Sequence, residues 1–139
     1  MTKIKKIKLN RFNEMKNEVS FLIADDHSIV RQGLEFILDD TFENIKIFHA
    51  SNFSEIIKIL NSTEINLIIL DVNFPDGTSL NYLTTIKKIQ PQIKILIFSA
   101  FDENIFAVRY LKAGANGYLT KISNTETFIK AVNLILKTG

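Results

Sequence analysis

The stretch Leu67-Ile-Ile-Leu-Asp71-Val-Asn-Phe-Pro75-Asp-Gly77 decides the fold. Its first four residues are all apolar, without the alternation of a strand that has one face in solvent. A strand that is apolar on both faces must be covered on both faces, which predicts a central position in a parallel sheet between two layers of helices. Asp71 follows directly where this strand ends, and Pro75 with Asp76-Gly77 is the clearest turn signal of the folded region.

Outward from this stretch, short apolar runs alternate with segments of helical period from Val19 onward, a pattern typical of repeated βα units. Ile95–Phe98 is a second run without alternation and indicates another central strand. The predicted strands are Val19–Ala24, Ile45–His49, Asn66–Leu70, Ile93–Phe98 and Gly117–Thr120. The predicted amphipathic helices are Ile29–Leu38, Phe53–Leu60, Leu80–Ile89, Asn104–Lys112 and Thr125–Leu136.

Local signals mark the ends of three of these helices. Asn52 with Glu55, and Ser123 with Glu126, have the spacing of capping boxes at helix N-termini. Gly114 suits a helix C-terminus, where a glycine often adopts a left-handed conformation.

Composition excludes several classes of protein. The 139 residues, 46% hydrophobic and 23% charged, predict one globular domain. No apolar run approaches the ~18 residues that a membrane-spanning helix needs. The absence of cysteine excludes disulfides, thiolate metal sites and cysteine nucleophiles. No secretory signal is visible, so a cytoplasmic location is expected.

Positive charge is concentrated at the N-terminus. Residues 1–18 contain six Lys/Arg, which leaves 11 basic and 13 acidic residues in the remainder. Such a cluster attracts polyanions such as nucleic acid or an anionic membrane. The favoured interpretation is a solvated, poorly ordered extension over residues 1–18, followed by the folded domain over residues 19–139.

Polar residues follow four of the five predicted strands. Since ligands of open doubly wound sheets bind beyond the carboxyl ends of the strands, these side chains are expected to meet at one edge. They are Asp25 and Asp26, Asp71, Ser99, and Lys121.

The three carboxylates of this set predict a metal site. They repel one another unless a cation neutralises them, and a site of oxygen ligands suits Mg²⁺ better than zinc. Asp26 and Asp71 are the candidate direct ligands, and Asp25 is expected to act through water.

At this point the residues resemble the receiver domain family of bacterial two-component response regulators, over Val19 to about Leu136. The resemblance implies a flavodoxin-like doubly wound (βα)5 fold with a five-stranded parallel sheet of order 2-1-3-4-5. The stretch Ile23-Ala-Asp-Asp-His-Ser-Ile-Val-Arg-Gln-Gly33 looks like the NarL/FixJ (LuxR-type) subfamily. The motifs in common are the Asp25-Asp26 pair, Asp71-Val-Asn-Phe-Pro75-Asp-Gly77, Ser99-Ala100 and Gly117-Tyr-Leu-Thr-Lys121.

The resemblance also implies a mechanism. Asp71 would accept a phosphoryl group from a sensor histidine kinase or a small donor such as acetyl phosphate, with Mg²⁺ as cofactor. Lys121 and the Ser99 hydroxyl would contact the phosphoryl oxygens, and the backbone carbonyl of Asn73 would complete the metal ligands. Tyr118 occupies the position of the family's switch aromatic. The chain would be a signalling domain and not an enzyme, apart from catalysing its own phosphorylation and dephosphorylation.

The implied output is a shift of the predicted fourth helix, fifth strand and fifth helix that controls a process such as transcription. The resemblance implies a homodimer after phosphorylation and no membrane contact. NarL/FixJ receivers usually precede a helix-turn-helix domain, which this chain does not contain, and DNA would be bound only through that domain.

Three residues depart from the family pattern. Ser79 stands where many receivers have glycine, and Ile122 and Ser28 stand where proline is frequent. Because these departures could impair phosphorylation, a phosphorylation-independent pseudo-receiver that acts through protein contacts remains the alternative. His27 is interpreted as a solvated or outer-shell residue.

Two other functions fit the sequence less well. A phosphatase of the haloacid dehalogenase type needs a second acid two residues after its nucleophile, where this chain has Asn73. An FMN-binding flavodoxin-like protein needs a phosphate-binding loop after the first strand, where Asp25 and Asp26 would repel the cofactor.

Overall fold

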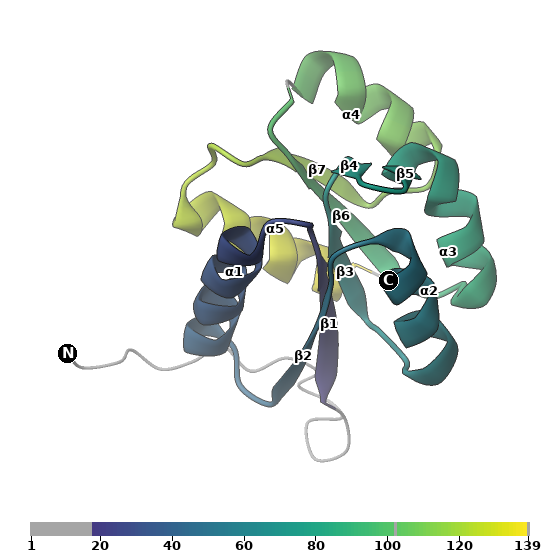
Figure 1. Ribbon diagram of the computed structural model, residues 1–139. Coiled ribbons are helices and arrows are strands. Elements are labelled where there is room, and N and C mark those ends of the chain that lie inside the picture. Colours follow the sequence, from purple (N-terminus) through teal and green to yellow (C-terminus); the bar gives the residue numbers. More distant parts are fainter. Residues whose placement is uncertain (1–17, 102, 139) are drawn as a thin grey trace.

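A five-stranded parallel sheet forms the centre of the computed structural model, which describes residues 18–101 and 103–138 (Figure 1). Neighbouring strands follow the order β2-β1-β3-β6-β7, which confirms the predicted 2-1-3-4-5 topology because β4 and β5 lie outside this sheet. All four residues of β3 are buried, as the apolar run predicts. The strands are β1 Val19–Ala24, β2 Ile45–Ala50, β3 Leu67–Leu70, β6 Lys94–Ser99 and β7 Gly117–Thr120.

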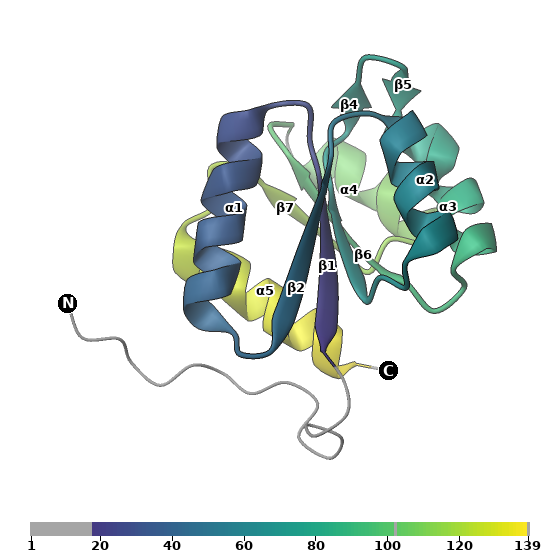
Figure 2. The same cartoon turned by 60° about the horizontal axis from the view of Figure 1, so that its bottom comes forward.

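Helices cover both faces of the sheet (Figures 1 and 2). On one face lie α1, Ser28–Thr41, and α5, Thr125–Lys137. On the other lie α2, Phe53–Ser62, α3, Leu83–Ile89, and α4, Glu103–Lys112. Successive residues of a strand point to opposite faces, so the sheet contributes to two separate apolar cores. Of the part of the chain that the structure describes, no helix is both long and apolar enough to span a membrane.

The helix ends agree with the sequence at two of the three predicted positions. Asn52 Oδ1 accepts a hydrogen bond from Glu55 N at 2.8 Å, and Gly114 has a φ of +113° just after α4. The cap predicted at Ser123 is wrong, because Asn124 Oδ1 accepts from Thr127 N. Ser123 N instead donates to the Thr120 carbonyl in a turn, so the N-cap lies one residue further along, while α5 begins at Thr125 as predicted.

The segment after β3 contains more structure than the sequence analysis predicted. Asn73–Phe74 (β4) and Gly77–Thr78 (β5) pair as a small antiparallel hairpin around the predicted turn. The helix predicted at Leu80–Ile89 begins as a 3₁₀ turn, η1, over Ser79–Tyr82 before α3. Gly77 has a φ of +136°, a conformation that favours glycine over residues with a side chain.

The turn of this hairpin is attached to the start of α2. The Asp76 carboxylate accepts hydrogen bonds from Phe53 N at 3.1 and 3.2 Å, and a longer one from Ser54 N at 3.4 Å. The Tyr82 ring stacks on Phe53 with centroids 3.6 Å apart. A carboxylate at a helix N-terminus pairs with backbone N–H groups that have no partner inside the helix.

Asp76→Ala is therefore expected to lower the free energy of unfolding by about 1 kcal/mol, the usual effect of removing a helix cap. Asp76→Asn keeps an acceptor oxygen and should cost less. Urea unfolding followed by circular dichroism measures both. Equal stability of the wild type and Asp76→Ala would contradict a capping role.

Candidate functional site

The carboxyl edge of the sheet brings three aspartates together. Asp25 and Asp26 follow β1, and Asp71 follows β3. Hydrogen bonds from Asp25 N to the Ala50 carbonyl and from Asp71 N to the Ala24 carbonyl, both 3.0 Å, continue the strand ladders to these residues. One ligand atom from each of Asp25, Asp26, Asp71 and His27 lies within 4.8 Å of the others. The sheet thus assembles the predicted carboxylate cluster.

Lys121 approaches this cluster from the end of β7. Its Nζ lies 2.7 Å from Asp25 Oδ2 and 3.3 Å from Asp71 Oδ2. Its backbone N donates to the Ser99 carbonyl at 2.6 Å, which continues the pairing of β6 with β7. Burial disfavours the charged amine, but the two carboxylates outweigh this effect and raise the pKa of Lys121. The ammonium is thus held as a cation between the two aspartates.

Asp71 lies in a poorly solvated position. It is 8% exposed, and its Oδ1 accepts a hydrogen bond from Val72 N at 2.8 Å. Burial, followed by the charge of Asp25, raises the pKa of the Asp71 carboxyl above its usual range, and Lys121 opposes this shift. The ionised carboxylate is therefore held at an energetic cost, which a further cation would relieve.

Asp25 and Asp26 differ in their surroundings. Asp25 is 2% exposed, and its Oδ1 accepts hydrogen bonds from His27 N at 2.9 Å and His27 Nδ1 at 2.8 Å. The Asp26 side chain is more exposed, with Oδ1 at 3.2 Å from His27 Nδ1. Asp25 therefore has fewer open coordination positions than Asp26. This difference agrees with the predicted division between direct and water-mediated ligands, which stays a prediction.

The donor set fits a hard divalent cation. Three carboxylates converge, while the Lys121 ammonium offsets one of their charges. The His27 ring is exposed at the rim, where its hydrogen bond with Asp25 and the charge of Asp26 raise its pKa. His27 Nδ1 lies 2.8 Å from Asp25 Oδ1, and the outer-shell place of His27 stays a prediction.

Ser99 and Tyr118 meet the backbone of the same residue. Ser99 is fully buried and its Oγ accepts a hydrogen bond from Phe101 N at 3.0 Å. The Tyr118 hydroxyl donates to the Phe101 carbonyl at 3.5 Å, and its ring is largely buried. The structure therefore places the two predicted switch residues around one short segment. Asn73 lies two residues after Asp71, at the start of β4.

Arg31 is a neighbour of the site that the sequence analysis did not single out. Its guanidinium donates to the Asp25 carbonyl at 2.6 Å from the first turn of α1. A basic residue in the first turn of the helix that follows the aspartate pair is the sequence signal that could have indicated Arg31.

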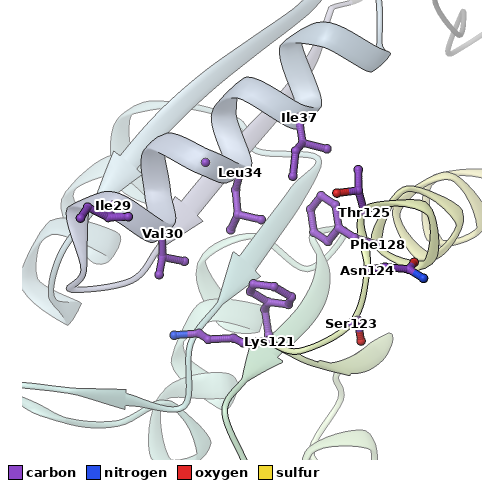
Figure 3. Close-up of a pocket in the computed structure, with 11 residues that line it drawn as sticks. Ile29, Val30, Leu34, Ile37, Lys121, Ser123, Asn124, Thr125 and Phe128 are labelled. Carbon is purple, nitrogen blue, oxygen red and sulfur yellow. The ribbon is translucent and has the colours of Figure 1, made fainter.

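A groove of about 250 Å³ lies beside the cluster, between α1 and the start of α5 (Figure 3). Val30, Leu34 and Phe128 line it with apolar surface. Lys121 is the one charged residue of its lining, so the groove offers no set of metal ligands. The chemistry of the site therefore lies at the aspartate cluster and not in this groove.

A family model and curated relatives both match the sequence of this chain. A family model described as "Response regulator receiver domain" matches residues 21–133. The "Fimbriae Z protein" of Escherichia coli (strain K12) is 32% identical over 117 residues, which are 84% of this chain and 56% of that protein. The "Oxygen regulatory protein NreC" of Staphylococcus epidermidis (strain ATCC 12228 / FDA PCI 1200) is 33% identical over 118 residues, 84% of this chain and 54% of that protein. The chain thus spans about half the length of these curated relatives.

A solved structure agrees with this match. The "two-component response regulator, LuxR family, from Aurantimonas sp. SI85-9A1" superposes with a TM-score of 0.78 at 26% identity. The match covers 86% of this chain and 86% of that chain.

Proposed function

The chain belongs to the response regulator receiver domain family of two-component signalling, with NarL/FixJ-like relatives, and we propose that Asp71 is its phosphoacceptor. The observation that carries this proposal is the Lys121 ammonium within 3.3 Å of the Asp71 carboxylate, beside the aspartate pair. An incoming phosphoryl group would find a nucleophile, a cation and a metal-binding cluster in one place.

In the proposed reaction a carboxylate oxygen of Asp71 attacks the phosphorus of the donor. A bond from that oxygen to phosphorus forms, the bond from phosphorus to the donor breaks, and the donor leaves with the electron pair. The Lys121 ammonium and the Ser99 hydroxyl donate hydrogen bonds to phosphoryl oxygens, which stabilises charge in the transition state. The product is an aspartyl phosphate.

Mg²⁺ would be held by Asp26, Asp71 and the Asn73 backbone carbonyl, with Asp25 acting through water. Bound there, the ion would offset the repulsion between the carboxylate and the anionic phosphoryl group. The burial of Asp71 and the charge of Asp25 both raise the pKa of the Asp71 carboxyl, which means that both destabilise its ionised form. A cation bound beside Asp71 would offset this destabilisation. Later attack of water on the phosphorus would restore Asp71, so the domain would catalyse only its own modification.

The proposed output is a change in α4, β7 and α5. The Ser99 hydroxyl would leave the Phe101 N–H for the phosphoryl group, and Tyr118, which also contacts the Phe101 backbone, would respond. Phosphate would shift the balance between two existing arrangements. We propose a sensor histidine kinase as donor, a cytoplasmic location, and a homodimer as the activated form. Control of transcription would act through a helix-turn-helix domain outside this chain.

Incubation with acetyl phosphate, with and without Mg²⁺, tests the proposal. Intact mass is expected to rise by one phosphoryl group only when Mg²⁺ is present. Borohydride reduces an acyl phosphate, so peptide mapping after reduction should mark Asp71. No added mass together with no binding of beryllofluoride would reject the proposal in favour of the phosphorylation-independent pseudo-receiver.

A further inference from the structure

Tyr110 of α4 reaches the segment that follows the acceptor site. Its ring is 2% exposed, and Ser79, at the start of η1, has no exposed surface. Ser79 Oγ donates a hydrogen bond to Tyr110 Oη across 3.2 Å. Tyr110 thus joins α4 to the start of η1 by a buried hydrogen bond between two side chains.

The same segment is joined to Asp71. Ser79 N donates to the Val72 carbonyl at 2.8 Å, and Val72 N donates to Asp71 Oδ1, also at 2.8 Å. On its other side the Tyr110 ring packs against Tyr118, with centroids 5.9 Å apart. Short contacts therefore run without a gap from the acceptor carboxylate to α4 and to the proposed switch aromatic.

We propose that the Ser79–Tyr110 hydrogen bond is a latch that holds α4 against the acceptor loop and opposes activation. The inference rests on the proposed function, in which phosphorylation shifts α4. The two hydroxyls lie in an apolar core that includes Val72, Phe74 and Leu83. If α4 moves away, both lose a partner where water does not replace it, and that is unfavourable.

The latch depends on Ser79, and so distinguishes this chain from receivers that have glycine at the same position. Many receivers have glycine at this position, as the sequence analysis noted, and glycine has no hydroxyl to donate. The bond stabilises the resting arrangement alone, so the activated arrangement is less populated than it would be with glycine. Coupling is reciprocal, so the latch also weakens the binding of any ligand that selects the activated arrangement.

Beryllofluoride with Mg²⁺ is the probe, because it mimics a phosphoryl group on aspartate. Its affinity is measured by NMR titration for the wild type, Ser79→Ala, Tyr110→Phe and the double variant. Both single substitutions keep the packing of the loop and of the ring. Tyr82→Phe is the matched control, since it removes a hydroxyl that donates to the Asp76 carbonyl of the same loop and is not part of the Ser79–Tyr110 bond.

Each single variant is expected to bind beryllofluoride about five- to tenfold more tightly, at the lower end of typical coupling between sites. The double variant should gain no more than one of the singles, because either change removes the same bond. Tyr82→Phe should bind like the wild type.

Equal or weaker binding by Ser79→Ala and Tyr110→Phe would overturn the latch, even if both variants unfold at lower temperature, because a purely structural bond changes stability alone. A gain in Tyr82→Phe of the same size would also overturn it. If the wild type binds no beryllofluoride, the proposed function fails and the latch fails with it. Binding by the wild type with unchanged variants rejects the latch alone.

Discussion

Asp71→Asn is expected to abolish phosphoryl addition from acetyl phosphate and, in the absence of divalent metal, to raise the melting temperature by several degrees. The amide is not a nucleophile comparable to a carboxylate, so no acyl phosphate forms. The stability gain follows from the raised pKa of the Asp71 carboxyl, which burial and the charge of Asp25 cause. A neutral side chain avoids both penalties although Lys121 loses one of its two partners. Function at this position thus opposes stability.

The pH dependence of stability provides the control for this variant. Because the folded-state pKa of Asp71 lies above its unfolded value, protonation of this carboxyl favours the folded state. Its contribution is fully present below the unfolded value and is lost as pH rises through the folded pKa. Thermal unfolding between pH 4 and 8 in EDTA should show this loss for the wild type and less of it for Asp71→Asn. Phosphoryl addition to the variant would show that another residue is the acceptor.

Lys121→Met is expected to slow phosphoryl addition about 10²- to 10³-fold, the usual loss when a donor to developing negative charge is removed. The same change should lower the free energy of unfolding by about 2–3 kcal/mol, since it leaves Asp25 and Asp71 without their cation. This loss is smaller than the ~3–5 kcal/mol typical of a broken buried pair, because the Lys121 side chain is 19% exposed. Initial rates of mass gain and urea unfolding measure the two effects.

Lys121→Arg keeps the positive charge and should recover most of the stability but less of the rate, since the guanidinium has a different shape. Lys121 lowers the pKa of the Asp71 carboxyl, so its removal raises this pKa further. The destabilisation of Lys121→Met should therefore shrink as pH falls and Asp71 becomes protonated. A stability loss that does not depend on pH would contradict the electrostatic explanation.

The elements of the fold were largely predictable because their signals are local. Runs without alternation predicted β3 and β6, and the order of apolar and amphipathic segments predicted a doubly wound sheet, which the structure confirms. The cap at Asn52 was predictable for the same reason. The cap at Ser123 was wrong because Ser123 turns back to Thr120, and Asn124 caps α5 in its place. The predicted extension over residues 1–18 lies outside the described residues except for Glu18.

The sequence by itself determined which side chains meet at the carboxyl edge, because each follows a strand whose apolar pattern sets its place in a parallel sheet. Only the tertiary structure decided how they interact. Lys121 lies between Asp25 and Asp71, Asp76 of the hairpin caps α2, and Tyr110 meets Ser79 across 31 positions of sequence. These contacts depend on directions and distances between elements, which packing of the two cores sets and which residue order alone does not encode.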